Sequence, residues 1–383
     1  MTITMRSLKT VYDKQITRRD SNIELFRIIT MIAIVAHHYV VNSGLLEVMY
    51  NDSLNSKSIF LLIFGAWGKI GINCFVFITG YFMCKSNITA RKFAKLLFEI
   101  LFYNISIGLI FLATGYESLS VTSIIKLFIP VKSISYDFSS CYIVFFLCIP
   151  FINALLHNIN ENKHLLLLLL SGFIYIFLGS LPGFNVTMNY VSWFIVLYFI
   201  SSYVRLYPKA HHNKTKLWSI LSAICTFICI VSIFVSFILC NKLGLSNAYY
   251  FVADSNKFLA VITGFSFFML FMNIKIPYIK FINTIASSTF GVLLIHANSD
   301  AMRQWLWKDT LNNVGMYNSP YLYFHAIGSV ITVFVICVVI DHIRIRLIEV
   351  PFFNLWDKLF PLIKCKYRLV EEKIFKKLIV KSS

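Results

Sequence analysis

The chain has 383 residues, of which 58% are hydrophobic and only 14% are charged. Soluble globular proteins average nearer half apolar and a quarter charged residues, so this composition excludes a soluble fold. Repeated apolar runs of about twenty residues instead predict a polytopic helical membrane protein. The formal net charge of +18 could suggest a nucleic-acid partner. The basic residues, however, gather at the N-terminus, in alternate short loops and in the C-terminal tail. That is the positive-inside pattern, and we expect no nucleic-acid partner.

The apolar runs predict an all-α transmembrane bundle of about ten spans. Their expected ranges are 24–42, 62–83, 93–113, 138–156, 165–181, 188–205, 217–240, 256–274, 285–301 and 322–341. The loops that follow the second, fourth, sixth and eighth spans carry most of the loop lysines and arginines, and we place these loops in the cytoplasm. An even number of spans then leaves both termini cytoplasmic. The chain divides into a cytoplasmic segment 1–21, a transmembrane domain 22–343 and a basic cytoplasmic tail 344–383, whose alternating aromatic and basic residues suit anionic membrane lipids.

The first predicted span holds the most informative residues. It opens with Glu24 and Arg27 and carries His37 and His38 near its far end; eleven residues separate Arg27 from His38, roughly 16 Å along a helix. Ionisable groups this deep are costly and usually face a bundle interior or a water-filled cavity. A neutral imidazole there can act as general base or nucleophile. Alternatively, a histidine could hydrogen-bond a neighbouring helix as a structural residue, and Glu24 could pair with Arg27 across one turn.

A second candidate site is the basic cluster at the cytoplasmic start of the third predicted span. Arg91, Lys92 and Lys95 lie there, with the two lysines on one face of the helix. The helix N-terminus adds a partial positive charge, so the cluster could clamp a phosphate. The positive-inside rule explains such a cluster equally well without any ligand.

Several further segments carry weaker signals. Phe75–Tyr81 ends the second span with a small residue and an aromatic, 291–296 ends in another intramembrane histidine, and Glu349–Pro351 follows the last span. Ser120–Pro130 is too short to span a bilayer, and we expect it to lie on the outer interface. The nine cysteines predict neither a metal site nor a disulfide framework. A glycine-rich phosphate loop and a nucleophile elbow are absent from the sequence.

In their order and spacing these residues resemble the acyltransferase 3 family of integral membrane acyltransferases. The likeness is greatest to the bacterial branch that O-acetylates exopolysaccharides and other surface glycans. The first span of that family typically carries an acidic residue, an arginine three residues later and a histidine eleven after that, which here are Glu24, Arg27 and His38. The end of its second span, two aromatics followed by Ser-Gly-aromatic, is similar to Phe75–Tyr81, with Thr79 for the serine.

The resemblance extends over about residues 20 to 355. Lys92 and Lys95 stand where the family has an Arg-x-x-Arg motif, which replaces two bidentate guanidinium groups with point charges. The stretch 140–153 is similar to the fourth span of the family, which often ends in Pro-x-x-Asn. The segments 291–296 and Glu349–Pro351 match the pattern of its last spans.

This resemblance implies transfer of an acyl group, usually acetyl, from cytoplasmic acetyl-CoA to a sugar hydroxyl at the bacterial cytoplasmic (inner) membrane. His38, with His37 beside it, would act as base or transient acyl acceptor, while Arg27 and Glu24 would orient the site. Arg91, Lys92 and Lys95 would hold the phosphates of CoA, and no metal would take part. The acceptor would be a surface polysaccharide or its lipid-linked precursor, and other polysaccharide-biosynthesis proteins could be partners.

Three other functions remain open at the level of sequence. A glycan-export transporter or flippase would not depend on acetyl-CoA and often shows paired broken helices, which we do not find. In a non-catalytic assembly subunit, the intramembrane histidines and Arg27 would be packing contacts only. A membrane glycosyltransferase would need an acidic metal-binding motif in a cytoplasmic loop, and the sequence has none.

Overall fold

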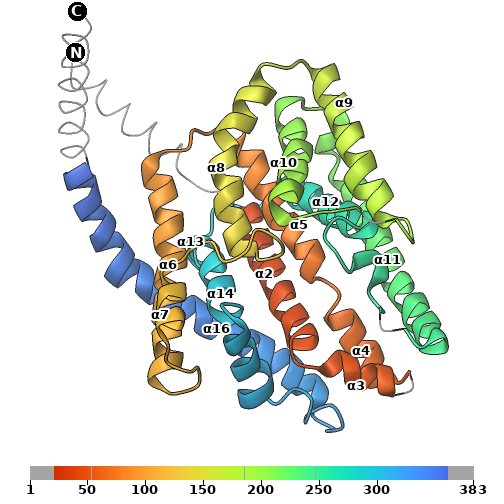
Figure 1. Cartoon of the computed structure of the whole chain (residues 1–383). Coiled ribbons are helices and arrows are strands. Elements are labelled where there is room, and N and C mark those ends of the chain that lie inside the picture. Colours follow the sequence, from red (N-terminus) through yellow and green to blue (C-terminus); the bar gives the residue numbers. More distant parts are fainter. Residues whose placement is uncertain (1–20, 53, 185, 246, 361–383) are drawn as a thin grey trace, which may run out of the picture.

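The computed structural model describes residues 21–52, 54–184, 186–245 and 247–360, and all regular structure within them is helical (Figure 1). The helices are α2 (Ser21–Val41), α3 (Leu45–Asn51), α4 (Ser56–Phe64), α5 (Gly68–Met83), α6 (Ala90–Ala113), α7 (Val121–Leu127), α8 (Phe138–His157), α9 (Glu161–Gly172), α10 (Tyr190–Leu206), α11 (Thr215–Leu243), α12 (Phe258–Asn273), α13 (Lys280–Ala286), α14 (Thr289–His296), α15 (Asp300–Arg303) and α16 (Leu322–Arg344). π-Helical segments continue α9, α15 and α16 over Phe173–Leu178, Gln304–Thr310 and Ile345–Glu349. The predicted all-α fold class is confirmed.

Seven helices of the described residues are long and apolar enough to cross a membrane. They span Ser21–Val41, Ser56–Met83, Ala90–Ala113, Phe138–His157, Glu161–Leu178, Thr215–Leu243 and Leu322–Phe360. Two shorter apolar helices, α10 and α12, coincide with the predicted spans 188–205 and 256–274 to within two residues at each end. These helices support a multi-pass membrane protein. The count of ten spans and the cytoplasmic placement of both termini stay predictions.

The predicted span 285–301 is divided in the structure. Helix α13 ends at Ala286, and α14 runs only from Thr289 to His296. Hydroxyl groups at the junction bind nearby backbone carbonyls, with Ser287 Oγ 2.7 Å from Thr284 O and Thr289 Oγ1 2.9 Å from Ala286 O. Such local hydrogen bonds compete with a continuous helix. Helix α14 begins after this break and ends at His296, which is buried inside the bundle.

Helices α2 and α5 form the centre of the bundle. α5 packs against α2, α10 and α12, while α2 also contacts α13, α14 and α16 (Figure 1). One buried amide ties this centre together, because Asn73 accepts a hydrogen bond from Trp193 Nε1 at 3.0 Å and donates one to Ser255 O at 2.7 Å. A polar group in an apolar interior is tolerated when it is paired in this way.

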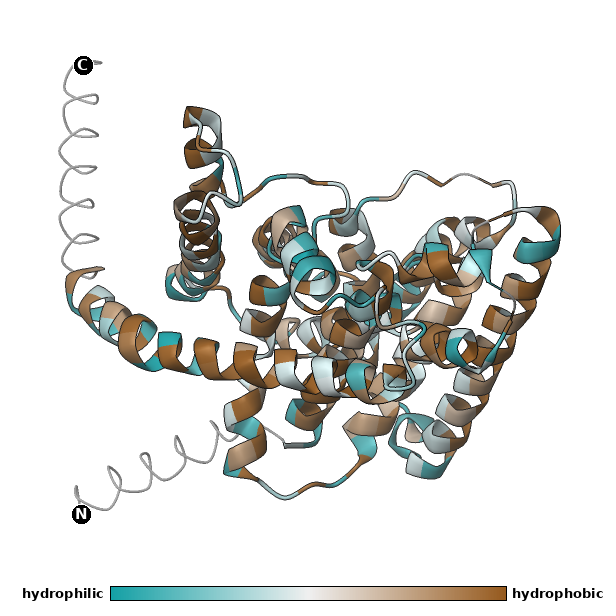
Figure 2. Ribbon diagram, turned by 90° about the horizontal axis from the view of Figure 1, so that it is seen from below, coloured by the Kyte–Doolittle hydropathy of each residue, from teal (hydrophilic) through white to brown (hydrophobic). Residues whose placement is uncertain are grey.

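Hydrophobic residues make up much of the helices, as the colours of Figure 2 show, and many of their large apolar side chains are exposed on the outside of the bundle. Phe151 on α8, Phe227 on α11 and Phe324 on α16 are 78%, 68% and 80% exposed. Surfaces of this kind suit contact with lipid chains rather than with water. The predicted segment 1–21, apart from Ser21, and the tail beyond Phe360 lie outside the described residues, whereas residues 344–360 continue α16 as helix.

Candidate functional site

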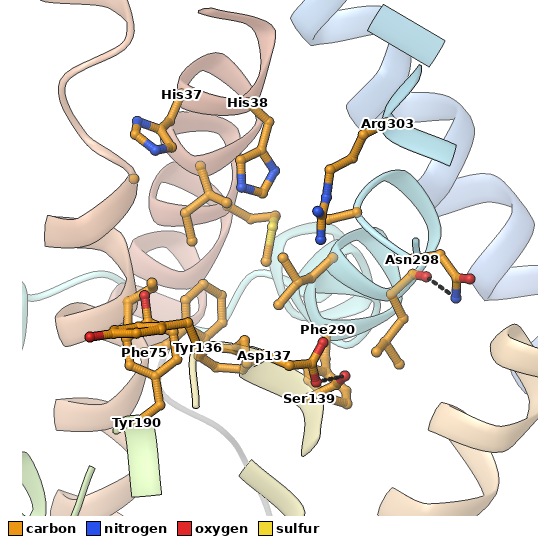
Figure 3. A pocket seen from close by; sticks show the side chains of 18 of the residues that line it. His37, His38, Phe75, Tyr136, Asp137, Ser139, Tyr190, Phe290, Asn298 and Arg303 are labelled. Atoms are coloured by element: carbon orange, nitrogen blue, oxygen red, sulfur yellow. Dashed lines mark hydrogen bonds between the residues drawn. The ribbon is translucent and has the colours of Figure 1, made fainter. Parts of the chain in front are cut away.

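A cavity of about 170 Å³ lies near the Val41 end of α2, and we call it the histidine cavity (Figure 3). Its polar lining consists of His37, His38, Lys69, Asn104, Tyr136, Asp137, Ser139, Tyr190, Asn298 and Arg303. These side chains come from α2, α5, α6, α10, the segment after α14, and the start of α8 with the loop before it. Six separate parts of the chain therefore converge on the two adjacent histidines that the sequence singled out.

His38 is paired with a second histidine. Its Nδ1 lies 2.9 Å from Nε2 of His296, whose own Nδ1 lies 2.6 Å from the carbonyl oxygen of Val292. Because a carbonyl only accepts hydrogen bonds, Nδ1 of His296 must carry a proton, and Nε2 of neutral His296 is then an acceptor. His38 consequently donates from Nδ1, which leaves Nε2 of neutral His38 as a bare lone pair.

His37 is fixed differently. Its Nδ1 donates to the carbonyl oxygen of Gly65 at 2.5 Å, in the break between α4 and α5. Its ring lies directly against Gly68, where an added Cβ would come within 2.2 Å of His37 Cδ2 and 2.8 Å of Nε2. Only glycine permits this approach. The backbone at Gly68 therefore covers one side of His37, while His38 faces Arg303 across the cavity (Figure 3).

Two cationic side chains lie in the cavity wall. Lys69 donates to the hydroxyl of Tyr190 at 2.8 Å and lies 3.9 Å from Asp254. Arg303 is ion-paired with Asp300, a carboxylate that is 97% exposed to solvent. An ion pair to an exposed carboxylate is worth little, so the charge of Arg303 remains available to a ligand. The cavity thus combines an accessible imidazole lone pair with two positive charges.

The other predicted residues of the first span lie outside this cavity. Arg27 Nη1 is 3.6 Å from Oε1 of the buried Glu24, which is the pairing across one helical turn that the sequence allowed. Neither side chain lines the histidine cavity, because about eleven residues of helix, roughly 16 Å, separate Arg27 from His38. A role for Glu24 and Arg27 in orienting the site stays a prediction.

The predicted phosphate clamp lies at the exposed start of α6, where Thr89 caps the helix. Arg91 Nε lies 2.7 Å from Asp357 Oδ1, and Lys95 Nζ lies 2.7 Å from Glu349 Oε1. Lys92 Nζ instead donates to uncharged oxygens of Ser86 and Asn87. The cluster therefore sits against acidic side chains from the extension of α16, and Lys92 is its member with only uncharged partners among the described residues.

A separate buried network surrounds Arg344, and we call it the arginine cluster. The guanidinium group lies 2.9 Å from Asp341, 2.7 Å from Glu349 and 3.2 Å from Glu99. Tyr103 donates its hydroxyl hydrogen to Asp341 at 2.7 Å. The π-helical turn Ile345–Glu349 brings the Glu349 carboxylate back toward Arg344. These contacts join α6 to α16.

Within the described residues, no group of three or more His, Cys, Asp or Glu side chains is arranged to hold a metal ion. The described cysteines are all free thiols.

The sequence matches the model of an acyltransferase domain family, Acyl_transf_3, over residues 20–341. The chain belongs to the acyltransferase 3 family. Comparison with curated proteins and with solved structures gives no match. The matched region contains both histidines of the hydrogen-bonded pair and every side chain that lines the histidine cavity.

Sequence reasoning about this acyltransferase missed several cavity residues. His296 was noticed only as another intramembrane histidine, since its pairing with His38 depends on how α14 packs against α2. Lys69 carried a usable signal, because an ionisable residue inside an apolar run is a site candidate by default. Arg303 follows the predicted span 285–301 directly, on the side of the membrane opposite the loops that we place in the cytoplasm. Asn104 and Asn298 gave no signal that separates them from packing residues.

Proposed function

We propose that this acyltransferase is an O-acetyltransferase of a bacterial cytoplasmic membrane, with about ten spans and both termini in the cytoplasm. It would move acetyl from cytoplasmic acetyl-CoA to a sugar hydroxyl of a surface polysaccharide or of its lipid-linked precursor. The family membership supports acyl transfer in a membrane. The acetyl group, the donor and the glycan acceptor come from the resemblance to the glycan-modifying branch.

The observation that carries the proposal is the hydrogen-bond chain from Val292 O through His296 to His38. It holds His38 as the tautomer whose Nε2 can accept a proton. As the acceptor hydroxyl oxygen attacks the thioester carbonyl, its proton passes to Nε2. The C–S bond then breaks, and the departing thiolate accepts that proton from Nε2 of His38. The products are an O-acetyl ester and CoA thiol, and His38 returns to its starting form.

Negative charge develops on the carbonyl oxygen during this attack. Arg303 faces His38 across the cavity and would stabilise that charge (Figure 3). In a two-step alternative, Nε2 of His38 attacks the thioester itself and forms an acetyl-imidazole, which the hydroxyl then opens. Both routes use the same nitrogen, and both require the neutral ring.

The donor would be held from the cytoplasmic side by the basic cluster at the start of α6. Lys92 fits this role best, since its partners are uncharged and a phosphate would not have to displace a carboxylate. Arg91 and Lys95 would have to exchange Asp357 and Glu349 for phosphate oxygens. Both lysine and arginine side chains here are about half exposed, so such an exchange needs little desolvation.

The test is the O-acetyl content of the cell-surface polysaccharide, measured by proton NMR in cells that express wild type, His38→Ala or His37→Ala at matched membrane levels. We expect His38→Ala to lower acetylation by about 10²- to 10⁴-fold, the usual contribution of a general base. His37→Ala should lose much less, because His37 is held against Gly68 and lacks the imidazole partner.

Two outcomes would overturn the proposal. If His38→Ala cells made less polysaccharide but acetylated it normally, the chain would be better explained as an export protein. If both the amount of polysaccharide and its O-acetyl content were normal, the chain would have a different acceptor. The thermal unfolding midpoint of each purified variant must match wild type, so that a loss of acetylation is not a loss of folded protein.

A further inference from the structure

A second, larger hollow opens toward the lipid between α6 and α16, and we call it the lateral groove. Its volume is about 980 Å³, and its walls are apolar, with Phe102, Ile107 and Phe111 on α6 and Val333 and Ile336 on α16. Rim residues such as Ile336 are half exposed on the outer face of the bundle. A groove with this lining and this position is suited to an apolar chain that enters from the bilayer.

The lateral groove and the histidine cavity meet at the histidine pair. His296 lines the groove, whereas His38, its hydrogen-bond partner, lines the cavity. An apolar ligand chain in the groove would therefore lie against His296, the hydrogen-bond partner of the reacting histidine. An apolar groove elsewhere on the bundle would have no such connection to the chemistry.

A third hollow, of about 680 Å³, lies on the neighbouring face of α6, and we call it the lysine pocket. Lys126 on α7 and Lys132 in the following loop line it. Within the described part of the chain, neither ammonium group is ion-paired, and Lys132 Nζ reaches only the amide oxygen of Asn104 at 3.4 Å. Asn104 and Asn298 line both this pocket and the histidine cavity, so the two hollows adjoin at this hydrogen-bonded pair.

The outer mouth of the lateral groove lies close to the lysine pocket. Tyr116 lines the groove and the next residue, Glu117, lines the pocket. A hydrogen bond to Asp309 raises the pKa of Tyr116 to about 12, so its hydroxyl stays protonated and polar at this mouth. In space, the lateral groove therefore lies next to the lysine pocket, and the lysine pocket lies next to the histidine cavity.

We propose that the acceptor is a glycan still attached to a membrane lipid through a phosphate, and that these three hollows bind its three parts. The apolar chain of the lipid lies in the lateral groove, and the phosphate lies between Lys126 and Lys132. The sugar reaches past Asn104 and Asn298 to His38. The proposal rests on the function proposed above and names the form of the acceptor. A finished polysaccharide would leave the groove and the two unpaired lysines without a role.

The test uses the full-length wild-type protein in nanodiscs of phosphatidylethanolamine and phosphatidylglycerol, with a polyprenyl phosphate that carries a photoreactive diazirine in its chain. Irradiation should label peptides of α6 and α16, and excess unlabelled polyprenyl phosphate should remove the label. A phosphatidylglycerol with the same diazirine in its acyl chain should label the two helices no more than other lipid-facing helices.

Matched variants locate the chain and the phosphate. Ile336→Trp fills the groove and should cut labelling by about tenfold or more, equivalent to ~1.4 kcal/mol. Val335→Trp is the control: it is the preceding residue, is similarly exposed at 50% against 52%, and does not line the groove. Lys132→Gln should weaken competition by polyprenyl phosphate and leave competition by the uncharged polyprenol unchanged.

Three results would overturn the inference: equal labelling by both probes, no effect of Ile336→Trp, or removal of the label by palmitoyl-CoA rather than polyprenyl phosphate. The last would assign the groove to the acyl chain of a donor. His38→Ala should label like wild type, because labelling needs no acetyl transfer. Labelling as expected in a protein that never acetylates a glycan would therefore count against the proposed function alone.

Discussion

The histidine cavity and the arginine cluster are separate regions of one bundle, and their buried charges have different partners. In the cluster, Arg344 is 2% exposed and contacts three carboxylates. Neither Arg344 nor these carboxylates line any of the three hollows, although Tyr103, which donates to Asp341, lines the lateral groove. In the cavity, the hydrogen-bond chain ends at an accessible nitrogen of His38, and open space lies beyond it.

This difference separates a structural role from a chemical one. Charges that satisfy one another inside a packed interface hold helices together, and removing one leaves the others buried and unpaired. A titratable group that faces open space has bonding capacity left for a ligand. Both regions contain ionisable residues within apolar runs, which sequence alone would treat as equivalent.

Arg344→Met should give the largest effect on stability. It leaves Asp341, Glu349 and Glu99 buried without their shared cation, and breaking such a network costs about 3–5 kcal/mol. We expect a lower yield of folded protein and a lower thermal unfolding midpoint in detergent, measured by tryptophan fluorescence. The molecules that do fold should acetylate at a rate close to wild type.

A triple variant sharpens this test. Adding Glu349→Gln and Glu99→Gln to Arg344→Met removes two of the three carboxylate charges that lose Arg344, and should recover part of the lost stability. The recovery is partial because Glu349→Gln also removes the ion pair with Lys95. A stable Arg344→Met protein without activity would break the comparison, since the arginine cluster would then belong to the reaction.

His296→Ala should give the opposite pattern, with activity lost and folding kept. Without the acceptor nitrogen of His296, the proton of His38 is no longer held on Nδ1. We therefore expect kcat to fall by about 10²-fold, at the low end of general-base contributions. His296→Gln should recover part of this loss, because the amide oxygen can accept from His38 Nδ1. The measurement is acetyl transfer per folded molecule; equal activity of the alanine and glutamine variants would contradict a positioning role.

Gly68→Ala should give the smallest effect of the three. The added Cβ would meet the His37 ring at 2.2 Å, and relief of that overlap should cost about 1–3 kcal/mol. Gly172→Ala is the control, because a Cβ there meets no atom within 4 Å. The thermal unfolding midpoint of Gly68→Ala should be lower than that of Gly172→Ala. A Gly68→Ala protein as stable as wild type would show that His37 can move without cost.

Much of the fold could be predicted because length and hydropathy alone identify long apolar helices. The all-α class and the multi-pass arrangement followed from that signal. The split of 285–301 did not, since Ser287 and Ser288 are compatible with either a helix or a break until the surrounding packing is known. Likewise, α10 and α12 are apolar but shorter than the other candidate spans.

The candidate site could be predicted in part. His37 and His38 were found because two histidines deep in an apolar helix are costly. Their partners His296 and Gly65 lie 258 and 28 residues away along the chain, and no spacing rule links residues so separated. The arginine cluster was missed for the same reason, although Glu99 and Asp341 each interrupt an apolar run.

The carbonyl of Val292, at the end of the histidine pair, has a consequence for energy coupling. A backbone carbonyl cannot pass a proton onward, so the two hydrogen-bonded imidazoles do not form a proton-conducting path. Any proton that Nε2 of His38 receives must leave again from the same nitrogen, into the same cavity. Turnover would therefore move no net charge between the two aqueous compartments, and its rate would be indifferent to the proton-motive force.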